Sequence, residues 1–214
     1  TRGSFVDRFV DEATTLDAFR AGTARDLGDF ANGSYALESI ERIAGGASGV
    51  HLGRTGSLDL GGTRRALRVD KYYELARGAA ELRVRWTIEN RDAERIVCDF
   101  ATELNLTLLA ANDPARWLSI GDGSERFAMG TTGTFHGVRR IALVDEWSKL
   151  RVSISLDRDA RVDRYPIETV SQSESGFERT YQGTCFVVRT PCHLDPGERT
   201  VMVLGLSASS LEIA

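Results

Sequence analysis

The sequence predicts an all-β fold, a single large antiparallel β-sandwich that spans residues 1–214. The first observation is that apolar and polar side chains alternate with a period of two along several segments, as in strands with one buried face. The second is that clusters of Gly, Pro, Asn and Asp separate these segments. The third is that no segment has the periodicity of a long amphipathic helix. Roughly nine or more such strands in one chain indicate two packed sheets.

The N-terminal third is the least regular part of the sequence. Residues 1–20 fit neither a strand nor a helix period cleanly, and we expect an irregular lead-in with one short helix. Between Gly28 and Arg42 the pattern turns to alternation, which predicts a strand. Residues 49–62 hold five glycines, which suit short strands joined by tight turns.

The middle and C-terminal parts give the clearest strands. Alternation predicts strands over 67–75, 82–89, 99–108, 150–156, 186–188 and 201–206. Turn clusters lie between or beside them, at 112–114, 121–124, 131–134 and 195–197. This order of strands and turns is typical of antiparallel sheets, so we expect one domain.

Composition narrows the class of protein. The formal net charge is −4 with both signs mixed along the chain, so nucleic acid and anionic membranes are not expected partners. Apolar runs such as 106–111 are too short to span a membrane. An odd set of cysteines (Cys98, Cys185 and Cys192) argues against a disulfide framework. Cys98 and Cys185 lie in apolar strand patterns, which predicts buried thiols and a reducing, cytoplasmic setting. The chain begins at Thr1 without a signal segment, which suggests a processed chain or a piece of a longer one.

Motifs for cofactor or metal chemistry are missing. The sequence has no dinucleotide-binding, phosphate-loop or nucleophile-elbow pattern, and Gly121-Asp-Gly-Ser124 is a glycine-rich turn. His51, His136 and His193 lack the spacing of metal ligands. The aspartates of 157–163 lack the glycine and terminal Glu of a calcium loop, so a solvated turn is the simpler interpretation. We therefore expect no cofactor and no metal.

The polar side of the 99–108 strand is the first candidate binding surface. Glu103 and Asn105 are two residues apart, so both side chains point to the same side of the strand. A carboxylate and an amide together can accept and donate hydrogen bonds to the hydroxyl groups of a sugar. An ordinary solvated sheet face explains the same pattern, and the spacing does not separate the two.

The stretch 165–183 is the second candidate. It is rich in hydrogen-bonding side chains, and three aromatic residues, Tyr165, Phe177 and Tyr181, could anchor it. Ordered loops of this kind on a rigid scaffold often carry binding groups. A long solvated connection is the alternative. The polar candidates are Glu168, Gln172, Glu174 and Gln182.

The same stretch carries a family resemblance. Pro166-Ile-Glu-Thr-Val-Ser-Gln-Ser-Glu-Ser-Gly-Phe-Glu178, followed by Tyr181-Gln-Gly183, closely resembles the C-terminal domain of family 57 glycoside hydrolases of the 4-α-glucanotransferase and α-amylase type. Phe5-Val-Asp-Arg-Phe9, Gly28-Asp-Phe30 and Thr102-Glu-Leu-Asn105 are similar to other parts of that domain in the same order. The resemblance runs from Ser4 to about Gly205.

The resemblance implies a sandwich of the galactose-mutarotase-like type. In that family the catalytic glutamate and aspartate belong to a preceding (β/α) barrel, whose alternation of strands and helices is not found in this sequence. We therefore expect a carbohydrate-associated domain without catalytic residues, with α-glucan (maltooligosaccharide) and the barrel of the same enzyme as partners. The expected binding or docking residues are Glu103, Asn105, Glu168, Gln172, Glu174 and Gln182.

Two alternatives remain open. The domain could be purely structural, with its polar residues buried against the barrel. It could also be a stand-alone mutarotase-like sugar epimerase, which needs a general acid and a general base beside the anomeric carbon. His136 or His193 with Glu103 or Glu168 are the candidates for that pair, although no sequence pattern joins them.

Overall fold

A computed structural model of the chain describes residues 3–42, 46–108, 110–173 and 176–211. These residues form 12 antiparallel strands and one short helix, which confirms the all-β prediction. The helix is α1 (Leu16–Ala21). The strands are β1 (Val6–Val10), β2 (Ala36–Arg42), β3 (Ser48–Leu60), β4 (Thr63–Leu75), β5 (Glu81–Asn90), β6 (Ile96–Leu106), β7 (Arg116–Ile120), β8 (Phe127–Ala128), β9 (Gly133–Asp145), β10 (Leu150–Ser173), β11 (Gly176–Leu194) and β12 (Arg199–Ser210).

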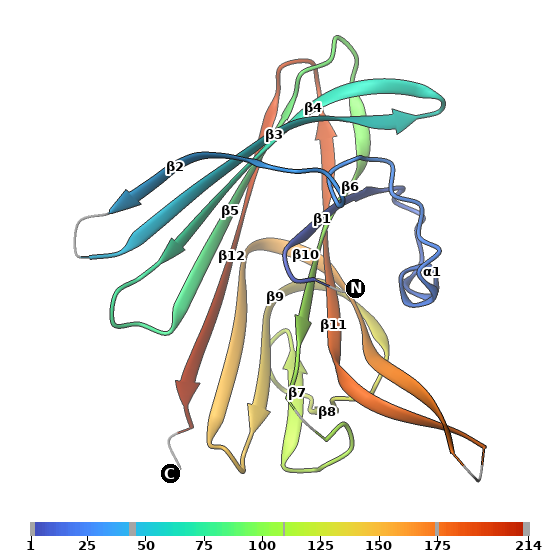
Figure 1. Cartoon of the computed structure of the whole chain (residues 1–214), viewed down its shortest axis with the longest axis vertical. Coiled ribbons are helices and arrows are strands. Elements are labelled where there is room, and N and C mark those ends of the chain that lie inside the picture. The colour runs from blue at the N-terminus through green and yellow to red at the C-terminus, as the bar shows by residue number, and fades with distance from the viewer. Residues whose placement is uncertain (1–2, 43–45, 109, 174–175, 212–214) are drawn as a thin grey trace.

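Strand β10 holds the two halves of the sandwich together. Its first part, from Leu150 to Leu156, pairs with β12, and its second part, from Arg161 onward, pairs with β11. The full order is β1-β6-β11-β10-β12-β5-β4-β3-β2. Outside this order, β9 also pairs with β10, and β7 pairs with β9. Because β10 changes partner along its length, the continuous sheet folds over on itself, and the inner faces of its two halves pack against each other (Figure 1).

The main core lies between these inner faces. Its largest members come from strands of both halves and are fully buried, as the period of two predicts. Each such side chain contributes about 1.5–3 kcal/mol by leaving water. Among them are Phe9, Trp86, Phe100, Phe186 and Leu204.

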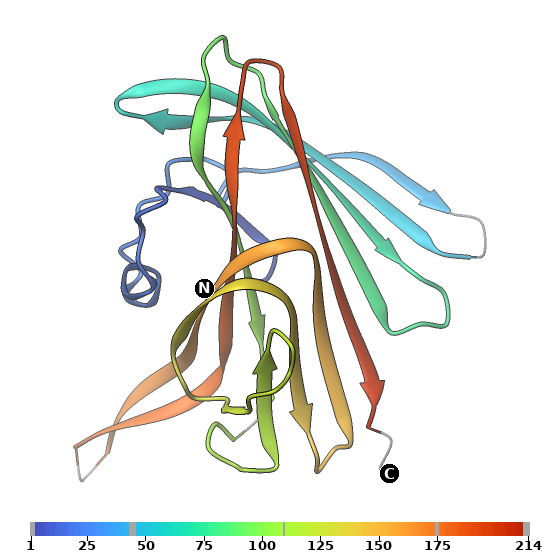
Figure 2. The same cartoon turned by 180° about the vertical axis from the view of Figure 1, so that it is seen from behind.

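A second, smaller core lies on the outside of β6, β11 and β10. Thr15 caps α1 by accepting a hydrogen bond from the Ala18 amide, and Gly22 ends it in the left-handed conformation. Phe19 on this helix packs into a cluster with side chains of the sheet. Both views show α1 outside the sheet beside β1 (Figure 2). The other buried members are Val10, Ala101, Tyr165, Cys185 and Val187.

A buried arginine fixes the lead-in on this outer face. Arg189 on β11 donates to Asp99 at 2.7 Å and to Asp163 at 3.3 Å, and all three side chains are largely buried. The same guanidinium donates to the backbone carbonyl oxygen atoms of Asp11, Glu12 and Thr14. A buried charge is tolerated when it is paired and hydrogen-bonded in this way. Residues 11–14 therefore cannot leave the sheet without exposing a charged cluster.

Most predicted strands are confirmed, with corrections in the first third. Residues 1–20 do contain the expected short helix, but 6–10 form strand β1 rather than irregular chain. Between Gly28 and Arg42 only 36–42 is a strand. The prediction of short strands over 49–62 is wrong, because 48–60 is one continuous strand, but Gly61 and Gly62 form the expected tight turn after it.

The glycines in β3 explain this last error. A Cβ on Gly49 would lie 2.2 Å from the hydroxyl of Tyr72, and one on Gly56 would lie 2.7 Å from the ring of Phe30. These glycines therefore leave room for side chains that cross the strand, and they do not break it.

The stretch 165–183 is a β-hairpin, so its prediction as a loop or connection is wrong. Strands β10 and β11 stay paired to Ser173 and Gly176, with one irregularity between Ile167 and Glu168. The end of this hairpin projects from the body of the sandwich (Figures 1 and 2). Both of its faces are largely exposed, so polar residues occupy both and the alternation that marks a strand is lost.

Two expectations from composition can be compared directly with the structure. All three cysteines are buried thiols, as expected for Cys98 and Cys185. Within the described ranges, no helix is long and apolar enough to cross a membrane.

Candidate functional site

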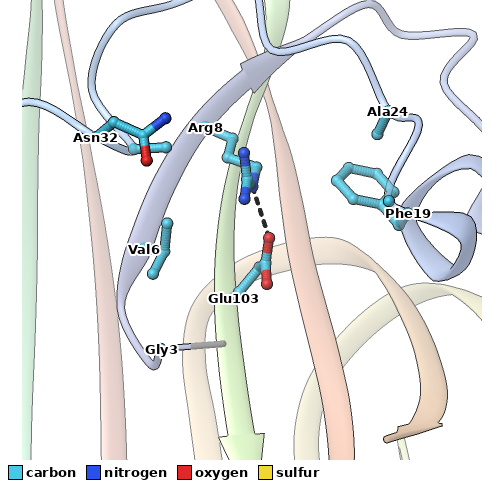
Figure 3. A pocket seen from close by; sticks show the side chains of 9 residues that line it. Gly3, Val6, Arg8, Phe19, Ala24, Asn32 and Glu103 are labelled. Atoms are coloured by element: carbon cyan, nitrogen blue, oxygen red, sulfur yellow. Dashed lines mark hydrogen bonds and ion pairs between the residues drawn. The ribbon is translucent and has the colours of Figure 1, made fainter. Parts of the chain in front are cut away.

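A pocket on the outer face contains the first sequence-predicted residue. It has a volume of about 350 Å³ and lies between β1, β6 and the chain that follows α1. Glu103 and Arg8 form its centre, with Asn32 on one side and Phe19 and Ala24 on the other (Figure 3). The remaining lining residues are Gly3, Val6, Gly22 and Ala31.

Glu103 is buried and held by an ion pair. The alternation of β1 turns Asp7 and Phe9 inward and therefore turns Arg8 to the outer face, where it lies diagonally across from Glu103 on β6. Arg8 Nε donates to Glu103 Oε1 at 2.6 Å. Arg8 Nη1 donates to Asp26 Oδ2 at 3.3 Å, so one guanidinium binds both carboxylates.

The charges in the pocket depend on each other. Burial alone lowers the pKa of Arg8, but hydrogen bonds and the negative charges of Glu103 and Asp26 outweigh it and raise the pKa. Burial raises the pKa of Asp26, and the amides of Gly28 and Phe9 offset only part of that effect. Arg8 is therefore a permanent cation at neutral pH, and it carries two acidic partners.

This arrangement suits binding better than acid–base catalysis. Glycoside hydrolysis needs two carboxyl groups on opposite sides of the glycosidic bond, one of them able to give up a proton. Here Glu103 and Asp26 share the same arginine. The pocket instead offers a carboxylate, a guanidinium, an amide and an aromatic ring, which can meet both hydroxyl groups and an apolar surface of a neutral ligand. Among the described residues, no group of three or more His, Cys, Asp or Glu is placed to hold a metal ion.

Asn105 lies on the same face and positions the chain that borders the pocket. Its Nδ2 donates to the Gly3 carbonyl oxygen at 2.6 Å, and its backbone amide donates to Ser4 Oγ at 2.9 Å. Asn105 is not part of the lining itself. The prediction that Glu103 and Asn105 share one face of the strand is confirmed. The alternative of an open, solvated face does not hold, because the N-terminal segment covers this face.

The other predicted site residues that the structure describes, Glu168, Gln172 and Gln182, lie on the hairpin and not in the pocket. Glu168 pairs with Arg179 at 3.3 Å across the two strands. Gln182 donates to Thr169 Oγ1 at 3.1 Å, and Gln172 is exposed opposite Phe177. Glu174 lies outside the described residues. The structure therefore divides the predicted residues into two separate groups.

The aromatic residues of this stretch differ in role. Tyr165 is buried in the second core, and Tyr181 packs partly against the main core, so both anchor the hairpin as predicted. Phe177 is 81% exposed, so its prediction as an anchor is wrong. It lies near the end of the hairpin, where no second layer covers the strands.

Sequence reasoning missed several residues of the pocket. Arg8 and Phe19 come from the lead-in that we expected to be irregular, Asp26 follows that lead-in, and Asn32 lies in the stretch in which alternation predicted a strand. Residues 5–9 do not alternate between apolar and charged side chains, so no local signal placed Arg8 on the outer face of a strand. The contacts of Asp26 depend on the path of the chain around α1, which has no local pattern.

The histidines do not form a catalytic pair with the predicted glutamates. His193 lies 2.6 Å from Glu12 Oε1, and His136 is exposed on β9. Neither lines the pocket that contains Glu103. Glu168 has Arg179 as its ion-pair partner.

Comparison with known proteins agrees with the fold. A family model described as "Alpha-amylase/4-alpha-glucanotransferase, C-terminal" matches residues 1–202. The chain is 32% identical over 191 residues to a 4-alpha-glucanotransferase of Thermococcus kodakarensis, a match that covers 89% of this chain and 24% of that protein. It is 34% identical over 131 residues to Alpha-amylase 1 of Dictyoglomus thermophilum, covering 59% of this chain and 18% of that one.

Solved structures give the same result. The crystal structure of 4-alpha-glucanotransferase from Thermococcus litoralis superimposes with a TM-score of 0.75 at 24% identity, over 96% of this chain and 27% of that chain. A putative aldose 1-epimerase of Escherichia coli K12 superimposes with a TM-score of 0.64 at 12% identity, over 88% and 73% of the two chains, which shows the galactose-mutarotase-like fold. The chain thus spans about a quarter of the length of the glucanotransferases that it matches. It belongs to the family of α-amylase/4-α-glucanotransferase C-terminal domains.

Proposed function

We propose that this chain is a non-catalytic accessory domain of an α-glucan-processing enzyme. In this proposal it packs against a catalytic (β/α) barrel of the same polypeptide and contacts the glucan through the Glu103 pocket. One observation carries the proposal: the family model covers 1–202, and the matched glucanotransferase is about four times as long as the match. The three buried thiols fit a reducing, cytoplasmic enzyme.

The chemistry of the pocket supports binding of a glucosyl unit. Its volume lies at the small end of the range for ligand pockets, about 300–1,000 Å³. Glu103 and Asn32 can hydrogen-bond sugar hydroxyls, and the ring of Phe19 offers an apolar wall for the C–H face of a sugar. The neutral, polyhydroxylated ligand requires no counter-charge, which fits a pocket whose central carboxylate, Glu103, is already paired with Arg8.

The hairpin supports the docking part of the proposal. Phe177 is 81% exposed and Val170 is 56% exposed, although both lie on an ordered two-stranded ladder. An isolated hairpin is only marginally stable in water, so contact with another surface would stabilise it. Glu168, Gln172 and Arg179 provide a polar rim around these apolar side chains, as at many protein–protein interfaces.

Calorimetric titration with maltotriose and maltoheptaose tests the glucan contact. We expect weak binding, with a Kd on the order of 1 mM. Glu103→Gln keeps an oxygen acceptor for Arg8 but removes the charge, and it should weaken binding severalfold. Gln172→Ala serves as the matched comparison on the hairpin: it should leave affinity unchanged if the pocket holds the sugar. Loss of binding only in Gln172→Ala would move the glucan site to the hairpin.

The accessory role has separate tests. An antibody against this chain should detect a polypeptide several times its size in an extract of the source organism, and a band at the size of the chain itself would contradict the proposal. Trypsin should cut the isolated chain after the exposed Arg179, and the same bond should be protected in the longer enzyme. A polarimetric assay of glucose mutarotation on the purified chain should show no acceleration.

A further inference from the structure

We propose that the exposed end of the inner face of β2, β3 and β4 is the surface on which the polypeptide preceding residue 1 packs. This surface is separate from the hairpin, which projects from the other side of the sandwich (Figures 1 and 2). The inference rests on the proposed function, because it requires a longer polypeptide. The inner-face patch consists of Leu37 and Ile40 of β2, Val50 of β3, and Tyr73 and Leu75 of β4.

The strand register shows that the inner-face patch continues the face that carries the main core. Directly opposite residues of antiparallel strands have their side chains on the same face of the sheet. Ile40 lies opposite Val50, and Val50 lies opposite Tyr73. Tyr73 in turn lies opposite Val84, which is fully buried in the main core. The exposed side chains of β2 are therefore the outer ends of rows whose inner ends form the core.

The cover over this face ends along β4. The inward-facing side chains of Leu67, Val69 and Lys71 are buried. Two and four residues further on, Tyr73 is only partly buried and Leu75 is 55% exposed. The two β2 side chains of the patch are 58% and 69% exposed. Several large apolar side chains that extend a core into solvent are typical of a surface that another protein segment covers.

The two ends of the strand order, β1 and β2, meet beside the patch. Tyr35, which precedes β2, donates to Asp7 Oδ2 of β1 at 2.6 Å, and Lys71 Nζ pairs with Asp7 at 2.9 Å. Next to this contact, the ring of Phe5 lies edge-on to Tyr73, with 5.8 Å between the ring centroids. Phe5 thus covers the border of the inner-face patch and leaves the rest of it open.

The start of the domain indicates which part of the protein covers the patch. Asn105 holds the residues before Phe5: its Nδ2 donates to the Gly3 carbonyl oxygen, and its amide donates to Ser4 Oγ. Because Phe5 contacts Tyr73, the polypeptide that precedes residue 1 enters the domain close to the patch. The family model describes a C-terminal part, and the matched glucanotransferase is about four times as long as the match. In the proposed enzyme, most of the polypeptide therefore precedes this domain and can cover the patch.

A second copy of the chain fits this surface less well. Charged side chains of Glu38, Glu41 and Arg42 lie along β2, and the pairing of β2 with β3 is irregular between Leu37 and Ser39. Charges and bulges of this kind hinder the pairing of an edge strand with another chain. The apolar side chains of the patch project from the face of the sheet, so they suit a layer that packs over the strands. An apolar segment of the preceding polypeptide provides such a layer.

Site-specific cysteine labelling tests the inner-face patch, because the three native thiols are all buried. Ile40→Cys and Leu75→Cys each place an exposed thiol on the patch, and Thr55→Cys places one on the opposite face of β3 as a control. Peptide mass spectrometry measures the rate of N-ethylmaleimide labelling at each position in the isolated chain and in the longer enzyme. Labelling at positions 40 and 75 should be slower by about tenfold or more in the longer enzyme, since a covered thiol reacts only when the contact opens. Labelling at position 55 should be equally fast in both proteins.

The outcomes separate this inference from the proposed function. A longer enzyme in which positions 40 and 75 react as fast as in the isolated chain would overturn the inference and leave the accessory role standing. Absence of any longer polypeptide would overturn both. A dimer of the isolated chain in sedimentation velocity that Ile40→Glu converts to a monomer would assign the patch to a second copy instead. Both cysteine variants on the patch should keep the urea midpoint of the isolated chain, and a clearly lowered midpoint would show that the patch belongs to the core of this domain.

Discussion

The two ends of the β10–β11 ladder differ in what covers them. At the near end, Asp163 and Arg189 are buried beneath residues 11–14 and pair with each other. At the far end, the same two strands carry Glu168 and Arg179 as an exposed pair and leave Phe177 in solvent. The strand pairing is continuous between them. The presence or absence of a second layer, and not the strand pattern, decides whether a polar residue here is structural or available to a partner.

The largest expected effect comes from the buried end. Arg189→Met should lower the free energy of unfolding by roughly 3–5 kcal/mol, because it leaves Asp99 buried without its cation and Asp163 with Arg161 as its remaining ion-pair partner. Arg179→Met, at the exposed end, should cost less than about 1 kcal/mol. Urea unfolding of both variants measures the difference. Equal losses would show that the two ends are not distinguished by burial.

The second core should be the next most sensitive region. Phe19→Ala removes the side chain that packs α1 on the sheet, and we expect a loss of about 3 kcal/mol. Hydrogen exchange should then be faster in residues 11–26 than in the main core strands. Exchange that is faster by the same factor in every strand would show that this layer does not unfold separately from the main core. That result would weaken the contrast between the covered and the exposed end of the β10–β11 ladder.

The turn that carries Trp147 should respond to acid. Burial raises the pKa of Asp145, but the Ser148 amide, Arg116 and the Ser148 hydroxyl outweigh it, so the pKa is lowered. A carboxylate with a lowered pKa stabilises the fold above its unfolded-state pKa and loses that contribution as the pH falls through the folded value. The stabilisation should therefore be complete above about pH 4 and disappear below it. The urea concentration at the midpoint of unfolding, measured as a function of pH, should show this decline in the native chain. In Asp145→Asn, the part of the decline that is due to Asp145 should be absent.

The smallest effect is expected at the tip of the hairpin. Phe177→Ser should change the stability of the isolated chain by no more than about 0.5 kcal/mol, because the side chain is exposed. In a longer enzyme the same change should weaken the contact between the parts, which thermal unfolding of that enzyme would detect. A loss of stability of the isolated chain above 1 kcal/mol would show that Phe177 packs within this domain.

Strand alternation was sufficient to predict the sandwich, since 67–75 and 82–89 each have one more deeply buried face. It failed where that condition is not met. Residues 165–183 have polar groups on both faces, so the hairpin resembled a loop. In β3, Gly49 and Gly56 resembled turns because the side chains for which they make room, Tyr72 and Phe30, are distant in sequence.

The candidate site was only half predictable for the same reason. Glu103 and Asn105 share a face, and a period of two shows this. Their partners do not follow from local patterns: Arg8 is 95 residues from Glu103 in sequence.

A proton NMR time course of maltoheptaose with the purified chain tests the accessory role most directly, because it reports binding and turnover together. The proposal of a non-catalytic glucan-binding domain predicts broadened glucan signals at once and no new anomeric signals after overnight incubation. New anomeric signals would show that the chain is itself an enzyme. Glucan signals as sharp as those in buffer would show that it does not bind the sugar.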